Sequence, residues 1–360
     1  MWLNWFIRSV LLCTTAIVLA GCASQVTQHD VRVFDEAALV RQCQPANGAT
    51  PARCDFAPAL IGDARHYRVE MIIKPASTPW VYAESRRLMH SSAIAIEQQN
   101  LSFLVNTRHP DGQPLQQDTY QGSPGLTLWL PGELHEIEQI AITATTPDKR
   151  LFILGDSTVC DQNPQWEKPA IARYSGWGQV LPAYLSQQVS VVNYADSGEG
   201  TQAFNIEDGE LFAPIAEQLR EKDIVLIQLG HNDKTTSAAV YEQRLSDLLL
   251  FIKARGALPI LVSPMIRNQG INLAQQHQWP QLDVRRSLQK ISQLQDIPLI
   301  DLMALSDAWV TELGQMAAQQ FFVPKDRTHS NEAGAHLFAS MLVEDITRRQ
   351  LPLAEYVISR

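Results

Sequence analysis

From residue 150 to the C-terminus, short apolar runs alternate with amphipathic stretches, and this alternation limits the fold more than any other feature. Apolar strands that alternate with helices predict a parallel sheet with helices on both faces. The expected strands are FILG, SVVNYA, DIVLIQLG, LPILVSP and PLIDL, and the expected helices cover 176–188, 209–222, 238–255, 281–295 and 331–349. Ligands bind such a sheet beyond the carboxyl ends of its strands, so motifs that follow the strands should meet there.

A different pattern precedes this region. Between residues 66 and 146, polar and apolar residues alternate roughly with a period of two, in runs separated by Pro, Gly, Asp and Asn. This pattern predicts a small antiparallel β-sandwich. A chain of 360 residues is long enough for two domains. We therefore expect a targeting segment at 1–22, a tether with a small disulfide loop at 23–60, the sandwich at 61–149 and the α/β domain at 150–360.

Four short motifs lie just after the expected strands or before the last helix. Ser157 lies in GDST, Gly198 in NYADSGEGT, Asn232 in GHND, and Asp326 precedes His329 in DRTH. A serine hydroxyl needs a base to act as a nucleophile, and a carboxylate–imidazole pair supplies one. The backbone N–H groups of Ser157 and Gly198 and the amide of Asn232 are suited to stabilise an oxyanion. Each motif alone is compatible with a turn, a cap or a surface residue, but together they predict an ester hydrolase.

These motifs resemble those of the SGNH, or GDSL, hydrolase superfamily. Within it, the stretches GDSTVCDQ, SGWGQVLP, NYADSGEGT, IQLGHNDK and LVSPMIR resemble the rhamnogalacturonan acetylesterase group of carbohydrate esterases. The resemblance implies a flavodoxin-like parallel sheet, a catalytic triad of Ser157, His329 and Asp326, and no cofactor. Many members of the group have Gly-Gly-Arg-Ser around the second motif, whereas here Glu199 follows the glycine. An arginine that would meet an anionic pectin is thus replaced by an acid, which leaves the identity of the polymer open.

Several other residues are candidates either for contact with substrate or for packing. Trp177 could wall the acyl pocket or belong to the core, and Arg267 could supply positive charge at the site or be ordinary surface charge. The same choice between sugar contact and core packing applies to four residues of the sandwich, Trp80, Tyr82, Arg86 and Trp129. The formal net charge of −9 argues against nucleic acid as a partner, and the sequence contains no recognisable metal-binding motif.

The N-terminal segment predicts export. Arg8 and the apolar stretch after it end in LAGC, whose cysteine is Cys22, and this resembles the lipobox of bacterial lipoproteins. The resemblance implies that Cys22 is diacylated and anchors the protein to a membrane of the cell envelope, preferably the outer membrane. The alternatives are an ordinary cleaved signal or an N-terminal helix anchor. In an oxidising envelope Cys43 and Cys54 can form a disulfide or remain thiols, and Cys160 is expected to be a packing residue.

We therefore expect a lipid-anchored serine esterase that removes O-acetyl groups from a polysaccharide, with pectic rhamnogalacturonan implied by the resemblance. One alternative is a lipase, lysophospholipase or thioesterase that acts on longer acyl chains. The other is a glycan-binding lipoprotein whose hydrolase domain does not turn over. The sequence has no long apolar lid near the motifs, which disfavours the first, and its complete set of site residues disfavours the second. The glycan, the deacetylated hydroxyl and the oligomeric state stay open.

Overall fold

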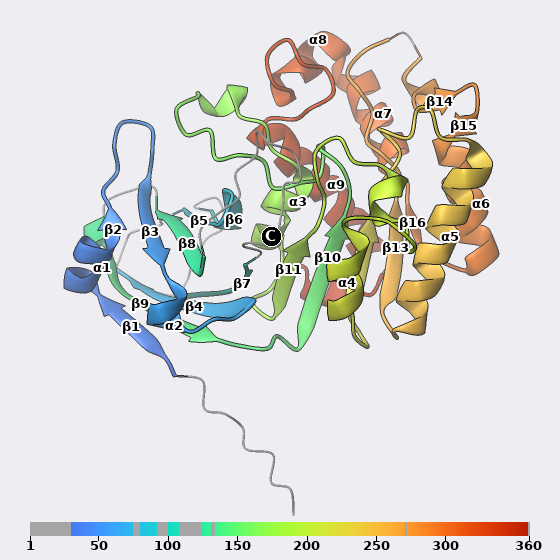
Figure 1. Cartoon of the computed structure of the whole chain (residues 1–360). Helices are drawn as coiled ribbons and strands as arrows, with labels where there is room; N and C mark the ends of the chain where they lie inside the picture. Colours follow the sequence, from blue (N-terminus) through green and yellow to red (C-terminus); the bar gives the residue numbers. More distant parts are fainter. Residues whose placement is uncertain are drawn as a thin grey trace, which may run out of the picture.

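The computed structural model describes residues 30–74, 80–91, 100–107, 124–130, 134–270 and 272–358. A β-rich unit and a larger α/β unit lie side by side, and one sheet runs through both (Figure 1). In spatial order its strands are β1 (Arg32–Asp35), β9 (Ile137–Ala144), β4 (His66–Ile73), β7 (Asn100–Asn106), β11 (Val189–Asn193), β10 (Lys149–Leu154), β12 (Ile224–Ile227), β13 (Leu258–Val262) and β16 (Leu299–Ile300). The expected targeting segment, with Cys22, lies outside the described residues.

The α/β unit has the strand order that places a ligand site at its centre. Its five strands run in the order β11-β10-β12-β13-β16, and every neighbouring pair is parallel. Counted along this unit, the order is 2-1-3-4-5, the flavodoxin-like arrangement. The chain reverses its direction of winding beside β10, so a crevice opens beyond the carboxyl ends of β10 and its neighbours. The predicted fold class is therefore confirmed.

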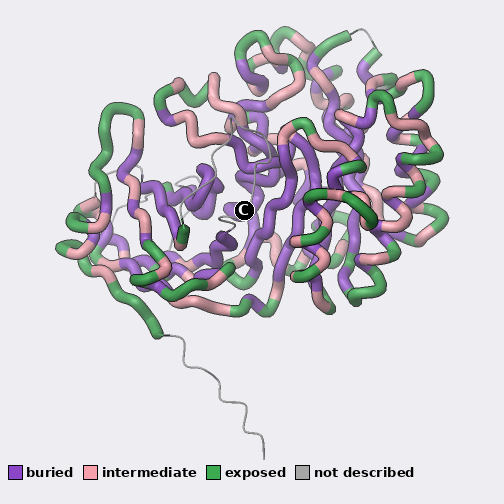
Figure 2. Tube along the Cα trace, viewed as in Figure 1, coloured by how far each residue is buried: buried purple, intermediate pink, exposed green. Residues whose placement is uncertain are grey.

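Helices cover both faces of this parallel sheet because successive strand residues point to opposite sides. Leu151 and Ile153 of β10 belong to one core, and Phe152 and Leu154 belong to the other. Figure 2 shows in purple that the strands at the centre of the α/β unit are buried. The first core is closed by α3 (Trp177–Val180) and α9 (Glu332–Arg348), and the second by α4 (Phe212–Gln218), α5 (Ala238–Ala254) and α6 (Val284–Gln295).

Three of the expected helices agree closely with these bounds, whereas the helix expected at 209–222 is only the seven-residue α4 and the helix expected at 176–188 is also shorter. It consists of α3 followed by a 3-10 turn at Leu181–Tyr184. Further elements that were not expected from the sequence are α7 (Leu302–Leu313), α8 (Gln315–Ala318) and the two-stranded ribbon of β14 (Gln278–Trp279) and β15 (Leu282–Asp283). No helix among the described residues is long and apolar enough to cross a membrane.

In the N-terminal unit two antiparallel sheets face each other across an apolar core. The strands β1, β9, β4 and β7 form one of them. The second has the order β2 (Cys43–Gln44), β3 (Ala52–Phe56), β8 (Leu126–Leu130), β5 (Val81–Ala83) and β6 (Arg87–His90), with α1 (Glu36–Gln42) and α2 (Pro58–Ile61) beside them.

The N-terminal boundary of this unit differs from the expected one. Residues 32–61, which were expected to form mostly a tether, contribute β1, β2, β3 and two short helices to it. Cys43 and Cys54 are joined by a disulfide that links β2 to β3 at a directly paired position. The segment is therefore part of the folded unit, because β1 pairs with β9 and Leu39 of α1 is fully buried in the apolar core.

Candidate active site

The candidate residues come together at the carboxyl ends of adjacent parallel strands. Ser157 follows β10, Gly198 follows β11, and Asn232 follows β12. Asp326 and His329 lie in the loop that leads into α9. This is the position at which a doubly covered parallel sheet binds its ligands.

A tight turn after β10 exposes Ser157 and buries its neighbour Asp156. The carboxylate of Asp156 accepts hydrogen bonds from the backbone N–H and the hydroxyl of Thr158, at 2.9 and 2.8 Å. Its carbonyl oxygen accepts from the backbone of Val159 and Cys160, which closes the turn. Gly155 permits this path, because a Cβ there would lie 2.8 Å from the Val159 side chain. Complete burial raises the pKa of Asp156 to about 6.

A continuous chain of hydrogen bonds connects Ser157, His329 and Asp326. Ser157 Oγ lies 2.8 Å from His329 Nε2, and His329 Nδ1 lies 2.8 Å from Asp326 Oδ2. The other oxygen of Asp326 accepts from the backbone N–H groups of Thr328 and His329. Burial raises the pKa of Asp326, but these hydrogen bonds outweigh it and hold the pKa well below its usual range. The anionic carboxylate thus keeps the imidazole with Nε2 turned toward the serine.

Tyr174 lies beside the hydrogen-bonded residues Ser157, His329 and Asp326 and was not expected from the sequence. Its ring meets the ring of His329 edge to face, with 5.6 Å between the centroids. Burial, together with the nearby Asp326 carboxylate, raises the pKa of Tyr174. The residue precedes the SGWGQ stretch by one position, but no local pattern signals a contact with a histidine so distant in sequence.

The loops of the two candidate oxyanion donors are bonded to each other. Gly198 has a φ of +86°, which a residue with a side chain rarely adopts. One N–H of the Asn232 side-chain amide donates to the Glu199 carbonyl at 2.9 Å. The next residue, Asp233, accepts from the backbone N–H and the hydroxyl of Thr201, at 3.0 and 2.5 Å. These contacts fix the Asn232 amide relative to the glycine loop, as preorganised donors require.

The structure separates the two proposed substrate contacts. Trp177 is fully buried and donates its indole N–H to the Gln228 side chain at 2.8 Å, so of the two alternatives the structure favours the core residue over the wall of the acyl pocket. Arg267 is half-buried beyond β13 and donates to the His231 carbonyl. Burial lowers the pKa of Arg267, and the nearby charges of Asp156 and Asp326 oppose that shift. Its positive charge therefore lies within reach of the site.

Cys160 is a packing residue beside the turn. It is buried, its thiol lies 3.5 Å from the Ser197 hydroxyl, and burial raises its pKa far above the ordinary value. The thiol is therefore not activated as a nucleophile. No group of three or more His, Cys, Asp or Glu residues within the described ranges could hold a metal ion.

The N-terminal unit contacts the segment between β10 and α3, the loop that contains Ser157. The turn between β5 and β6 presses against that loop: the Ser85 hydroxyl donates to the Gln162 carbonyl, and the Arg86 guanidinium donates to the Tyr174 carbonyl. The side chain of Gln162 in turn donates to the carbonyl of Ser157 at 2.7 Å. Glu84 and Arg86 both adopt left-handed backbone conformations, with φ of 54° and 53°.

A buried ion pair also joins the N-terminal unit to this loop. Arg87 of β6 donates through Nε and Nη2 to the carboxylate of Asp161, at 2.9 and 2.5 Å, and through Nη1 to the Asn106 carbonyl. Both side chains are almost completely buried. Asn193 at the end of β11 donates to the other Asp161 oxygen. The two units therefore share a buried polar junction immediately behind the nucleophile turn.

The parallel sheet brings together a serine, an imidazole and a carboxylate that are linked by hydrogen bonds, beside glycine and asparagine donors. This arrangement is typical of α/β acyl hydrolases. Comparison with known proteins gives the particular family. The model of the GDSL-like Lipase/Acylhydrolase family matches residues 151–342, more than half of the chain, and the chain belongs to this family. The protein is accordingly an esterase or acylhydrolase of the GDSL type.

Three relatives illustrate what the chain is similar to. Rhamnogalacturonan acetylesterase RhgT of Bacillus subtilis is 32% identical over 232 residues, which cover 59% of this chain and 95% of that protein. The probable rhamnogalacturonan acetylesterase YesY of the same organism is 29% identical over 220 residues, 58% of this chain and 97% of that protein. The crystal structure of B. subtilis YxiM matches 89% of this chain and 88% of its own, with 22% identity and a TM-score of 0.53, which shows a shared fold across both units.

Proposed function

We propose that this esterase is a carbohydrate O-acetylesterase that works through Ser157, His329 and Asp326. The observation that carries the proposal is the unbroken hydrogen-bond chain from the serine hydroxyl through the imidazole to an anionic carboxylate. Such a chain activates an otherwise unreactive hydroxyl, because the imidazole accepts its proton while the carboxylate stabilises the imidazolium.

The reaction follows from the geometry in two balanced steps. Ser157 Oγ attacks the acetyl carbonyl carbon while its proton moves to His329 Nε2, and the tetrahedral oxyanion is held by the N–H groups of Ser157 and Gly198 and the Asn232 amide. The imidazolium then protonates the departing sugar oxygen, which leaves an acetyl-serine. Water attacks this ester with His329 again as base, and acetate leaves as the serine regains its proton.

The proposed substrate is the O-acetyl group of a pectic rhamnogalacturonan. The names of RhgT and YesY, a rhamnogalacturonan acetylesterase and a probable one, support this choice, and both relatives align over nearly their whole length with more than half of this chain. Arg267 supplies the positive charge that an anionic backbone needs, since Glu199 occupies the position expected to hold an arginine. Burial and the neighbouring acids Asp196 and Glu210 raise the pKa of Glu199.

A comparison of acetate release from three substrates tests this proposal. O-acetylated rhamnogalacturonan should be the best substrate, acetylated xylan a poorer one, and a long-chain lipid ester the poorest. The Ser157→Ala variant, with an unchanged unfolding midpoint, should lose more than about 10³-fold in turnover. Turnover retained in that variant would refute the mechanism. Preference for the lipid ester would reassign the protein to the lipases, and preference for acetylated xylan would change the glycan.

We also propose that Cys22 carries a lipid that anchors the enzyme in the bacterial envelope, because the LAGC motif places a cysteine after an apolar stretch. The full chain expressed in a bacterial host should partition into the detergent phase, whereas a Cys22→Ser variant should stay in the aqueous phase. Equal partition of both would refute the lipid anchor.

A further inference from the structure

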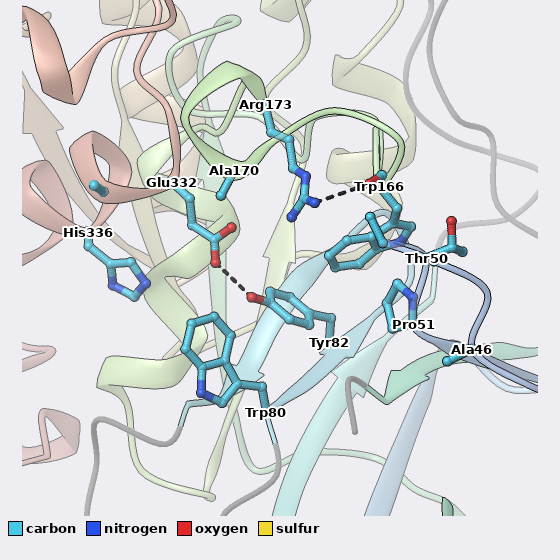
Figure 3. Close-up of a pocket in the computed structure, with 13 residues that line it drawn as sticks. Ala46, Thr50, Pro51, Trp80, Tyr82, Trp166, Ala170, Arg173, Glu332 and His336 are labelled. Carbon is cyan, nitrogen blue, oxygen red and sulfur yellow. Dashed lines mark hydrogen bonds between the residues drawn. The ribbon is translucent and has the colours of Figure 1, made fainter. Parts of the chain in front are cut away.

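A cavity of about 520 Å³, which Ser157 does not line, opens where the two units meet (Figure 3). One wall comes from the loop between β2 and β3, with Thr50 and Pro51, and from Trp80 and Tyr82 beside β5. The opposite wall comes from the α/β unit, from the segment that precedes α3 and from the first turns of α9. Its volume lies within the range of small-molecule sites.

Aromatic rings make up much of this cavity. Trp80 is 40% exposed, and its ring centroid lies 6.3 Å from that of Tyr82. Tyr82 meets Trp166 edge to face at 5.2 Å, and Trp166 rests against the buried Trp129. Trp80 is the one tryptophan with more than a third of its surface exposed among the described residues, although an aromatic side chain of this size is normally buried. A rigid ring exposed beside a cavity is a platform for the apolar face of a planar or cyclic ligand.

Polar groups of both signs complement these rings. Glu332 accepts a hydrogen bond from the Tyr82 hydroxyl through Oε1, at 2.7 Å. Arg173 is held in place because it donates to the carbonyls of Lys168 and Trp166 and lies over the Trp166 ring. Figure 3 shows its guanidinium directed into the cavity, toward the ring of Tyr82. The cavity thus offers a fixed donor, a fixed carboxylate acceptor and an aromatic platform.

This combination matches the chemistry of a neutral sugar. A pyranose ring has an apolar face of C–H groups for a tryptophan and hydroxyl groups that both donate and accept. A uronate would bring its carboxylate close to Glu332, and the guanidinium of Arg173 only balances that charge. We propose that this cavity binds a neutral pyranose residue of the polysaccharide whose acetyl groups the triad removes. The inference rests on the proposed function for the identity of the polymer, while the cavity is separate from Ser157.

The cavity is connected to the active site through two short segments of chain. Glu332 begins α9 three positions after His329. Arg173 immediately precedes Tyr174, whose ring packs on His329. A glycan held in the cavity would therefore lie against the other side of the segments that shape the triad. We expect it to bind the polymer chain at a distance from the acetyl group that reacts.

Direct binding to the intact Ser157→Ala protein tests the proposal, with tryptophan fluorescence and calorimetry as readouts. The neutral probes are L-rhamnose and acetyl-free galactohexaose and xylohexaose, with hexagalacturonate as the acidic counterpart. At least one neutral probe should bind, and the additional Trp80→Ala change should weaken it about tenfold or more, as expected for loss of an aromatic anchor. The matched control is Leu294→Ala, which truncates a 75% exposed apolar side chain on α6 and should leave binding unchanged.

Kinetics of the active enzyme separate this inference from the proposed function. The ratio of kcat/KM for the acetylated polymer to that for a small acetate ester should fall about tenfold in Trp80→Ala and stay constant in Leu294→Ala. Hydrolysis of acetyl esters by a protein that binds no neutral probe would overturn the inference and leave the function intact. Exclusive binding of hexagalacturonate would overturn the neutral-sugar assignment. Binding without any Ser157-dependent hydrolysis would support the cavity and refute the esterase proposal.

Discussion

Replacing Arg87 by alanine should destabilise the protein strongly, because it strands the buried carboxylate of Asp161. Arg87 is 2% exposed and Asp161 5%, and the guanidinium makes both short bonds to that carboxylate. Removing one partner of a buried ion pair typically costs about 3–5 kcal/mol, because the remaining charge has no compensation. The Arg87→Ala variant also leaves the Asn106 carbonyl without this donor. We expect a loss within that range in the free energy of unfolding.

Urea unfolding at neutral pH measures this loss, and two further variants identify its cause. Arg285→Ala breaks an ion pair of similar length with Asp301, whose side chains are 35% and 28% exposed, and should cost no more than about 1 kcal/mol. The double variant Arg87→Met/Asp161→Asn removes both charges and keeps an oxygen acceptor for Asn193, so it should recover much of the stability. Equal losses in Arg87→Ala and Arg285→Ala, or a double variant no more stable than Arg87→Ala, would refute the reasoning.

Three other outcomes can be measured with a small acetate ester or by unfolding. Asp326→Asn should lower kcat by roughly 10³–10⁴-fold at an unchanged unfolding midpoint, since the neutral amide no longer stabilises the His329 imidazolium, and a loss below tenfold would contradict this. Asn232→Ala should lower kcat by roughly 10²–10³-fold with little change in KM, and a change confined to KM would rule out an oxyanion role. The pKa of His66 is lowered to about 3 by burial and nearby arginines, so the unfolded chain binds a proton below pH 6.5 that the folded protein does not, and stability falls from pH 6.5 toward 3. Between pH 7 and 4.5 the free energy of unfolding should fall by about 2–3 kcal/mol more in the wild type than in His66→Gln. Asp156, whose raised pKa acts in the opposite direction, is present in both proteins, so its contribution cancels in this difference. Parallel pH profiles would contradict the prediction.

The parallel half of the fold could be predicted because its signals are local. Each strand is a short apolar run followed by a motif, and helices such as α9 begin at residues that cap them, here Asn331 with its side chain on the Gly334 N–H. The continuation of the sheet into the N-terminal unit could not be predicted. It depends on the pairing of β7 with β11, which is recorded at a single register position, Val105 opposite Val191. Nothing in either strand alone specifies that neighbour.

The site divides in the same way. Ser157, Gly198, Asn232, Asp326 and His329 could be proposed from the sequence because each lies in a recognisable motif after a strand or before a helix. The contacts that support them were missed, because they join residues far apart in sequence. Aromatic and basic residues were the hardest to place.

The four sandwich residues considered for sugar contact illustrate the difficulty. Trp80 is exposed, whereas Tyr82, Arg86 and Trp129 are almost fully buried. The period-two pattern predicts the strands, but it does not show which part of the protein packs on the outer face of each sheet. The α/β unit covers the second sheet of the sandwich: Tyr82 and Trp129 share a core with Trp166 and Trp177.

The disulfide between Cys43 and Cys54 has a consequence for how this enzyme could diversify. The bond joins the two strands of the β2–β3 hairpin, and the loop that connects these strands lines the cavity between the two units. A covalently closed stem tolerates exchanges of loop sequence and length, because the register of its strands no longer depends on the loop. Changes at residues 45–51 would therefore reshape the rim of the proposed sugar site and leave Ser157, His329 and Asp326 in place. The β2–β3 hairpin is thus a part of the protein in which the ligand site can vary separately from the catalytic residues.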